Sequence, residues 1–220
     1  MKVAVGKIDP AKAYSLTEAL GLVKETSKVK FDATIEVHVV LNVDPKKTDQ
    51  LVRSTVTLPH GTGKTVRVAA FVADNEVAKA KAAGADLAGS DDLIEQIKTT
   101  SKCDFDVAVA TPDMMKKLAV IARVLGQKGL MPNPKTGTIA PDVTKLIAEL
   151  KAGKVTFKRE ASGVIHAAIG KVSFPTEQVA ANIETLIDAV RKAKPVSIKG
   201  ALIKSVYVAS SMGPSVKVSL

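Results

Sequence analysis

Short apolar runs alternate with helical patterns through the middle of the chain. The apolar runs at residues 68–72 and 107–110 are rich in valine and alanine and have the length of buried strands. Helical patterns occupy residues 76–83, 93–98, 112–125 and 142–151, and several are opened by proline or aspartate and closed by glycine. Because strands that alternate with helices form parallel sheets covered by helices, this block predicts a β/α domain.

The two ends of the chain read differently from the middle. Strands are predicted at residues 34–43, 55–58, 155–159 and 164–169, which are rich in β-branched side chains. Amphipathic helices are predicted from Ser15, which has the capping-box spacing to Glu18, and from Pro175. Asp44 and Pro45 predict the start of a short helix that runs to about residue 53. Residues 205–220 predict a β-hairpin whose tip lies at residues 210–215.

A split arrangement accounts for both kinds of pattern. Residues 1–66 and 154–220 are predicted to pair into one α+β domain. Residues 67–153 are predicted to form an inserted, Rossmann-like β/α domain, so that the fold class is α/β and α+β with two domains. The chain crosses between the domains near Gly61, Gly63 and Gly153. Because glycine lets the backbone change conformation at little cost, we expect these three residues to act as hinges.

The positive charge lies almost wholly in the two ends. The formal net charge is +10, from 32 Lys and Arg against 22 Asp and Glu, and residues 67–153 contribute only +1 of it. A protein of this charge has a polyanion as its default partner. Aromatic residues make up 3% of the chain and Trp is absent. This composition disfavours base stacking on a sheet and favours structured RNA that is read by backbone shape and 2′-hydroxyls.

The rest of the composition indicates a cytoplasmic protein. The one cysteine, Cys103, excludes an internal disulfide, which fits a reducing compartment. No apolar run reaches the roughly 18 residues of a membrane span, and the first residues lack the apolar core of a signal peptide. We therefore expect a cytoplasmic location and no membrane partner.

Residues 60–65, H-G-T-G-K-T, look like part of a phosphate loop. That motif requires glycine at position 58, where Leu58 stands, and a strand-like run follows in place of a helix. Neither G-x-G-x-x-G nor G-x-S-x-G occurs, and His38, His60 and His166 are scattered without cysteines nearby. We therefore expect no catalytic residue, no metal and no cofactor. Two alternatives stay open, a nucleotide-using enzyme built on the β/α block and a non-specific RNA chaperone.

Three segments carry candidate RNA contacts. The hairpin tip combines hydroxyls with Met212 and Gly213, which suits contact with ribose hydroxyls and phosphates, and an ordinary polar loop is the alternative. Phe31, just before the first strand, is either an RNA contact or a core residue. The loop at residues 125–141, rich in glycine and proline, carries Lys128 and Lys135 and is either a secondary RNA contact or a scaffold loop.

Five motifs along the chain resemble one protein family. They are Lys30-Phe31-Asp32, Leu58-Pro59-His60-Gly61, the run G-L-M-P-N-P-K at residues 129–135, Gly163-Val164-Ile165-His166 and Ser211-Met212-Gly213-Pro214-Ser215. In this order they closely resemble the L-one family of large-subunit ribosomal proteins. The long G-L-M-P-N-P-K run makes the resemblance specific.

The resemblance implies a structural protein rather than an enzyme. It implies binding of large-subunit rRNA at the mobile stalk, a role in the release of deacylated tRNA from the exit site, and repression of translation through the protein's own operon mRNA. The partners implied are therefore the ribosome, that mRNA and exit-site tRNA, and we expect the free protein to be a monomer. Carried over by motif, the RNA contacts are Phe31, Thr34, His166, Ser205, Ser211, Met212 and Gly213.

Two positions depart from the pattern of the family. Many bacterial relatives have Lys in the turn occupied here by Glu160-Ala161-Ser162, and many have Thr where Ser211 stands. The first departure puts an RNA contact at that turn in doubt. The second leaves a hydroxyl at the hairpin tip.

Overall fold

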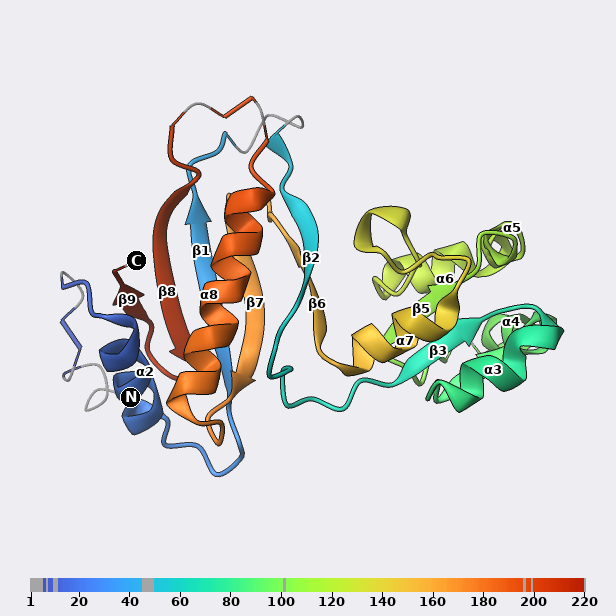
Figure 1. Cartoon of the computed structure of the whole chain (residues 1–220), viewed down its shortest axis with the longest axis horizontal. Helices are drawn as coiled ribbons and strands as arrows, with labels where there is room; N and C mark the ends of the chain where they lie inside the picture. Colours follow the sequence, from blue (N-terminus) through green and yellow to red (C-terminus); the bar gives the residue numbers. More distant parts are fainter. Residues whose placement is uncertain are drawn as a thin grey trace. The chain divides into compact units, whose positions relative to one another are not determined.

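The computed structural model describes residues 6, 8, 9, 12–44, 50–100, 102–195, 197, 198 and 200–219 (Figure 1). The chain divides into two compact units, a split unit of Met1–Lys64 with Gly153–Leu220 and an inserted unit of Thr65–Ala152. Both units combine helices with strands, which confirms the mixed class of the fold. The chain crosses between them beside the boundaries predicted at residues 66 and 154. That each unit folds on its own stays a prediction.

A four-stranded antiparallel sheet forms the centre of the split unit. Its strands lie in the order β7 (Val164–Lys171), β1 (Thr34–Leu41), β8 (Ile203–Ser210) and β9 (Val216–Val218). Along β1, the buried Ile35, Val37, Val39 and Leu41 alternate with half-buried residues. Because successive side chains of a strand point to opposite faces, this alternation gives the sheet one apolar face and one outward face.

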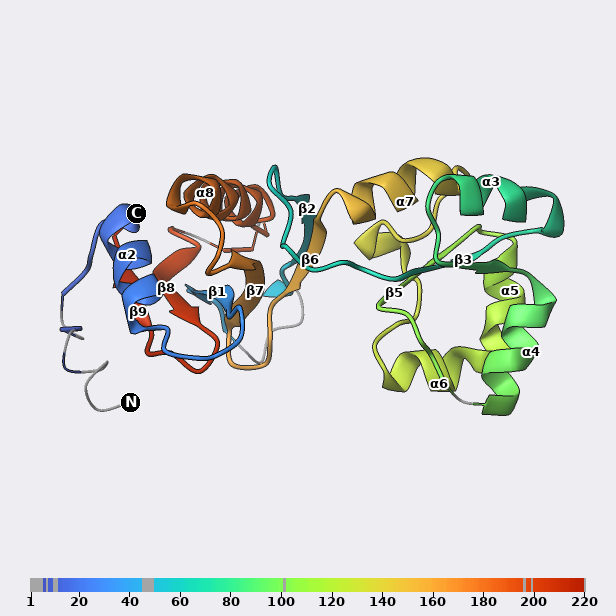
Figure 2. The ribbon, with the colours of Figure 1, turned by 90° about the horizontal axis from the view of Figure 1, so that it is seen from below.

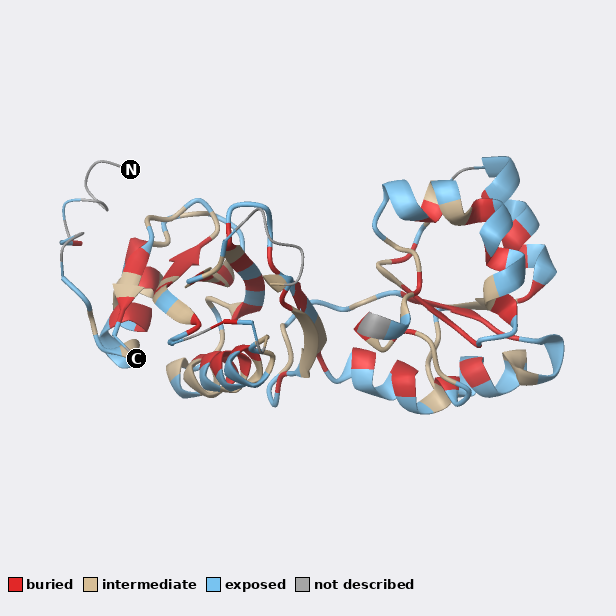
Figure 3. Ribbon diagram, turned by 90° about the horizontal axis from the view of Figure 1, so that it is seen from above, coloured by how far each residue is buried: buried red, intermediate tan, exposed pale blue. Residues whose placement is uncertain are grey.

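Two helices cover the apolar face. α2 (Leu16–Thr26) and α8 (Thr176–Lys192) pack on the same side of the sheet (Figure 2). Their buried residues belong to the same core as those of β1, and Figure 3 colours the buried residues of both helices and of the sheet red. The capping box predicted for α2 is confirmed, since the Glu18 amide donates to Ser15 Oγ at 3.4 Å and the Ser15 amide donates to Glu18 Oε2 at 3.1 Å.

A separate two-stranded sheet lies near the two chain crossings. β2 (Arg53–Thr57) pairs antiparallel with β6 (Lys154–Lys158). The strand predicted at residues 55–58 therefore begins earlier, because Arg53 and Ser54 also pair with β6. Most of the short helix predicted from Pro45 lies outside the described residues, which omit 45–49. Its predicted end at Arg53 is wrong, since Arg53 begins a strand.

The inserted unit contains a parallel sheet, as the alternating pattern predicts. β3 (Val68–Phe71) lies between β4 (Leu87–Gly89) and β5 (Val107–Ala110). The sequence analysis missed β4, which has only three residues and reads L-A-G. Its neighbour β3 is buried along its whole length, as expected for a parallel strand covered on both faces. A closer likeness to Rossmann folds stays a prediction.

Helices cover both faces of the parallel sheet. α3 (Val77–Ala82), which follows the 3₁₀ turn Asp74–Glu76, and α7 (Val143–Lys151) contribute to one core. On the other face lie α4 (Asp91–Thr100), α5 (Met114–Leu118) and α6 (Ala122–Gln127). The single helix predicted over residues 112–125 is wrong, because the 3₁₀ turn Ala119–Ile121 interrupts it. The β-branched pair Val120 and Ile121, which have low helix propensity, lies at this break.

No described helix is long and apolar enough to cross a lipid bilayer.

Candidate nucleic-acid interface

The hairpin tip between β8 and β9 is a tight turn with an exposed methionine. The Gly213 amide donates to the Ser210 carbonyl at 2.8 Å, which closes the turn. Met212, inside the turn, has a φ of +64° and is 79% exposed. A left-handed conformation costs a non-glycine residue about 1–2 kcal/mol, and such strain is often found where a side chain has a function. The turn therefore presents a large apolar side chain to solvent from a strained backbone.

Gly213 is required by the turn itself. A Cβ atom at this position would lie closer than 3.0 Å to Ser210 Oγ and 3.2 Å from the Ser210 carbonyl oxygen. The φ of Gly213 is not among the positive values, so the need is for space rather than for a special backbone conformation. Gly213 is predicted as part of an RNA contact, and the structure adds a reason within the turn for a glycine at this position.

The tip is bonded to the beginning of β1. The Ser211 amide donates to the Thr34 carbonyl at 2.9 Å, and the Thr34 amide donates to Ser211 Oγ at 3.3 Å. From β7, Lys171 Nζ donates to Thr34 Oγ1 at 3.0 Å and to the Asp32 carbonyl at 3.4 Å. We call Phe31, Thr34, Lys171, Ser211 and Met212 the tip cluster. Hydrogen bonds join its hydroxyls and its ammonium group, while the exposed Met212 follows Ser211 and the exposed Phe31 lies three residues before Thr34.

The sequence analysis missed Lys171. It reaches the cluster because β1 and β7 pair with Thr34 opposite Lys171, a register that no local pattern in the sequence reveals. Phe31 is 58% exposed, so the alternative that it is a core residue is wrong. Phe31 and Met212 are both large apolar side chains that are exposed, and a role of either in RNA contact stays a prediction.

The other predicted contacts of the split unit lie farther along the outward face of the sheet. His166 of β7 is opposite His38, and Ser205 of β8 is opposite Val40. Residues directly opposite one another in a sheet project from the same face, and Thr34, His38 and Val40 alternate with buried residues. A strand rises about 3.3 Å per residue, so along β1 His38 lies about 13 Å from Thr34 and Val40 about 20 Å from it. His166 and Ser205 lie opposite these two residues. The outward face of the sheet therefore carries Thr34, His166 and Ser205, whereas the predicted contacts Phe31, Ser211, Met212 and Gly213 lie outside the strands.

The two histidines contact each other across the strands. His38 Nδ1 lies 2.7 Å from His166 Nδ1, and His166 Nε2 lies 3.7 Å from Glu160 Oε2. Burial, and after it the charge of His166, lower the pKa of His38, while Glu36 acts in the opposite direction. No local pattern in the sequence predicts this pair, because the register of β1 and β7 brings the two residues together.

The three glycines predicted as hinges have left-handed backbones. Gly61, Gly63 and Gly153 have φ values of +64°, +70° and +102°. A Cβ on Gly153 would come within 3.0 Å of the Gly61 backbone, and one on Gly63 would lie 2.8 Å from Lys171 Cγ. Close packing and positive φ explain why glycine stands at these positions. Their hinge role stays a prediction.

The two lysines predicted as secondary contacts lie in the inserted unit. Lys128 is exposed at the end of α6, and Lys135 lies in the 3₁₀ turn Pro134–Thr136. Hydrogen bonds from Thr136 Oγ1 and Thr138 Oγ1 to the Asn133 carbonyl, at 2.9 and 3.2 Å, order the loop around Lys135. The structure thus supports an ordered loop, and RNA contact there stays a prediction.

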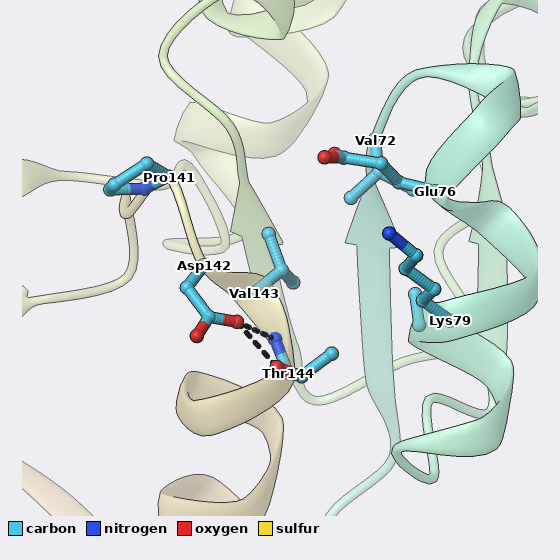
Figure 4. A pocket seen from close by; sticks show the side chains of 8 residues that line it. Val72, Glu76, Lys79, Pro141, Asp142, Val143 and Thr144 are labelled. Carbon is cyan, nitrogen blue, oxygen red and sulfur yellow. Dashed lines mark hydrogen bonds between the residues drawn. The ribbon is translucent and has the colours of Figure 1, made fainter.

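The inserted unit also has a cavity of about 310 Å³ beyond the end of β3 (Figure 4). Glu76 and Lys79 line it on one side, and Asp142 and Thr144 on the other. Asp142 caps α7 and accepts a hydrogen bond from the Thr144 amide at 3.1 Å. Two carboxylates against one ammonium group leave the cavity without net positive charge, and Asp142 already occupies the N-terminus of α7, so these residues do not suit a nucleotide. Within the described part of the chain, no group of three or more potential metal ligands occurs.

Comparison with known proteins places these features in a family. Residues 23–214 match the model of the ribosomal protein L1p/L10e family. The chain is 54% identical over 217 residues to the large ribosomal subunit protein uL1 of Chloroflexus aurantiacus, covering 98% of this chain and 92% of that protein. It is 53% identical to uL1 of Corynebacterium glutamicum over 98% of this chain and 91% of that protein. It is 51% identical to uL1 of Mycolicibacterium vanbaalenii over 99% and 92%, respectively.

Proposed function

Because this chain belongs to the ribosomal protein L1p/L10e family, whose members are structural proteins of the large subunit and not enzymes, we propose that its split unit binds the rRNA of the mobile stalk. The tip cluster makes the specific contacts in this proposal. Family membership sets aside the alternative of a nucleotide-using enzyme.

The observation that carries the proposal is the strained and exposed Met212 beside Ser211 and Thr34. Hydrogen bonds to β1 hold the turn in one conformation, so the cluster is preorganised and loses little entropy on binding. Hydroxyls and backbone groups suit ribose 2′-hydroxyls and phosphates, and Lys171 supplies a positive charge. An exposed methionine and phenylalanine add apolar contact to sugars or to splayed bases.

The distribution of charge supports the same assignment. The split unit carries +9 of the formal net charge of +10, and the inserted unit carries +1. Neutralisation of RNA phosphates by lysine and arginine releases counterions and provides most of the sequence-independent affinity. The unit that presents the tip cluster is thus also the one that an RNA attracts.

Several finer roles follow from the family resemblance and belong to the same proposal. They are repression of translation by binding the protein's own operon mRNA, contact with exit-site tRNA and promotion of its release, a cytoplasmic location on the ribosome, and a monomeric state when free. Lys128 and Lys135 are proposed as a secondary RNA contact.

A titration with two RNAs tests the proposal. A stalk rRNA fragment and an unstructured RNA of equal length are each titrated with the protein at two salt concentrations. We expect the stalk fragment to bind at least tenfold more tightly at both. Equal affinity for the two RNAs would instead identify a non-specific RNA chaperone, since charge alone does not distinguish folds.

A further inference from the structure

A continuous row of polar side chains crosses the outward face of the four-stranded sheet. His166 of β7 is opposite His38 of β1, which is opposite Tyr207 of β8, which is opposite Lys217 of β9. Neighbouring strands are about 4.8 Å apart, so the row spans about 14 Å. All four side chains are half-buried or exposed. Neither charge nor periodicity reveals this row, because it joins one residue from each of four strands.

The row is positively charged at one end and proton-binding at the other. Lys217 supplies an ammonium group, and the two histidines lie 2.7 Å apart between their Nδ1 atoms. The ionisable groups that face the pair are Tyr207 and Lys217 within the row, Glu36 two residues along β1, and Glu160, whose Oε2 lies 3.7 Å from His166 Nε2. The carboxylates lie beside the row rather than in it.

We propose that this row, His166-His38-Tyr207-Lys217, is a second contact surface for the RNA backbone, and that its histidine pair takes up one proton when a phosphate binds. The inference rests on the proposed function, because it takes the occupant to be the same RNA that the tip cluster binds. Two arguments favour RNA over a protein partner. The unit carries +9, and the row lies on the same face of the sheet as Thr34 of the tip cluster, about 13 Å farther along β1.

The contact between the histidines limits how many protons the pair can hold. One ring donates its Nδ1–H to the bare Nδ1 of the other, so the donating ring has a bare Nε2 when the pair is neutral. That Nε2 can take a proton without breaking the contact, and the pair then carries one positive charge. A second added proton would set two N–H groups against each other. A phosphate that binds the row therefore favours uptake of one proton and no more.

The side chains of the row suit contact with the RNA backbone better than recognition of individual bases. Lys217 and a protonated histidine lack the planar, paired N–H donors of arginine. Donors of this simpler kind suit phosphate oxygens. Tyr207 can donate its hydroxyl to a phosphate or a ribose. Tyr207→Phe keeps the ring and removes the hydroxyl. The substitution should weaken binding if Tyr207 contacts the RNA backbone, and it should leave binding unchanged if the ring stacks on a base.

The first experiment measures salt dependence with the full-length protein and the stalk rRNA fragment. Lys217→Gln is compared with Lys192→Gln, an exposed lysine in the last turn of α8, a helix that covers the opposite face. For Lys217→Gln we expect a threefold to tenfold loss of affinity and a fall of about one in the slope of log K against log salt. Lys192→Gln should change neither. Equal effects of the two substitutions would overturn the proposal, because they would reflect net charge alone.

The second experiment measures pH dependence between pH 8 and pH 5.5. For the unaltered protein we expect log K to rise as the pH falls, with a slope no steeper than −1, since uptake of one proton changes K at most about tenfold per pH unit. The double variant His38→Gln, His166→Gln should lose most of this rise, so that its log K changes little between pH 8 and pH 5.5. His60→Gln, in an exposed loop outside the row, should keep it.

The outcomes separate this inference from the proposed function. If the unaltered protein shows no preference for the stalk fragment, the proposed function fails. If it shows the preference, and a tip-cluster variant loses it while all row variants keep the original affinity, salt slope and pH profile, the row alone is refuted. Circular dichroism and thermal unfolding of each variant confirm that it is folded, and Tyr207→Phe provides a readout that leaves all charges unchanged.

Discussion

The amide of Ser211 donates to the carbonyl oxygen of Thr34 at 2.9 Å, and the Thr34 amide donates back to Ser211 Oγ at 3.3 Å, across 177 residues of sequence. The hairpin tip and the start of β1 are therefore a single piece of structure. A candidate RNA contact on one is positioned by the other, and changes at the tip can be tested for binding and for stability separately.

Met212→Gly should separate these two effects. Glycine removes the exposed side chain and also relieves the left-handed backbone at φ +64°. The relief of about 1–2 kcal/mol is partly offset by the greater entropy of glycine in the unfolded chain, about 0.5–1 kcal/mol. We expect the free energy of unfolding in urea to stay the same or rise by up to about 1.5 kcal/mol. Affinity for the stalk fragment should fall about tenfold, or about 1.4 kcal/mol.

Met212→Leu is the matched control, since it keeps an apolar side chain and the backbone strain. It should retain most of the affinity. A Met212→Gly protein that binds the stalk fragment as well as the unaltered protein would show that the side chain has no part in binding. Gly213 is less suitable for this test, because any Cβ there collides with Ser210.

Lys171→Met should weaken RNA binding with little effect on the fold. Methionine keeps an unbranched apolar stem and removes the ammonium group that donates to Thr34 Oγ1. Because the side chain is partly exposed, we expect the free energy of unfolding to change by less than about 1 kcal/mol. Affinity should fall threefold to tenfold, and the salt slope should fall by about one. An unchanged slope in the titration would show that Lys171 only supports the cluster.

Gly153→Ala should destabilise the protein strongly. The backbone has a φ of +102°, and the new Cβ would come within 3.0 Å of the Gly61 backbone, which cannot rotate away as a side chain can. Backbone strain and overpacking together should cost about 2–4 kcal/mol in urea unfolding. Gly126→Ala is the control, because nothing lies within 4 Å of a Cβ in that helix. It should be neutral or stabilising by up to about 1 kcal/mol, and similar losses at both sites would contradict the packing argument.

His38 should make the free protein less stable in mild acid. Its folded-state pKa is lowered, first by burial and then by His166, from the ordinary value of 6.5. The unfolded chain therefore binds more protons than the folded protein below pH 6.5, and the free energy of unfolding falls as the pH drops through this interval. His38→Gln should show a smaller fall between pH 7 and pH 5, and His60→Gln should match the unaltered protein. Parallel pH profiles for all three proteins would refute this account.

Several elements could be predicted from the sequence because neighbouring residues determine them. The burial pattern of β1 follows from the alternation of Ile35, Val37 and Val39 with polar residues. The starts of α2 and α7 follow from side chains that accept hydrogen bonds from amides two or three residues ahead, at Ser15 and Asp142. The parallel sheet of the inserted unit follows from the order of strands and helices. The resemblance of the motifs also sufficed to identify the family.

Only the tertiary structure decided which residues share a surface. The pairing of Thr34 with Lys171, the contact between His38 and His166 and the row to Lys217 depend on the register of strands far apart in the chain. The strain at Met212 likewise depends on how β8 turns into β9. Local patterns determine the face of each side chain, because the strand period is two. Register is instead selected by the packing of the whole buried face, a sum over many distant contacts that no single stretch of sequence contains.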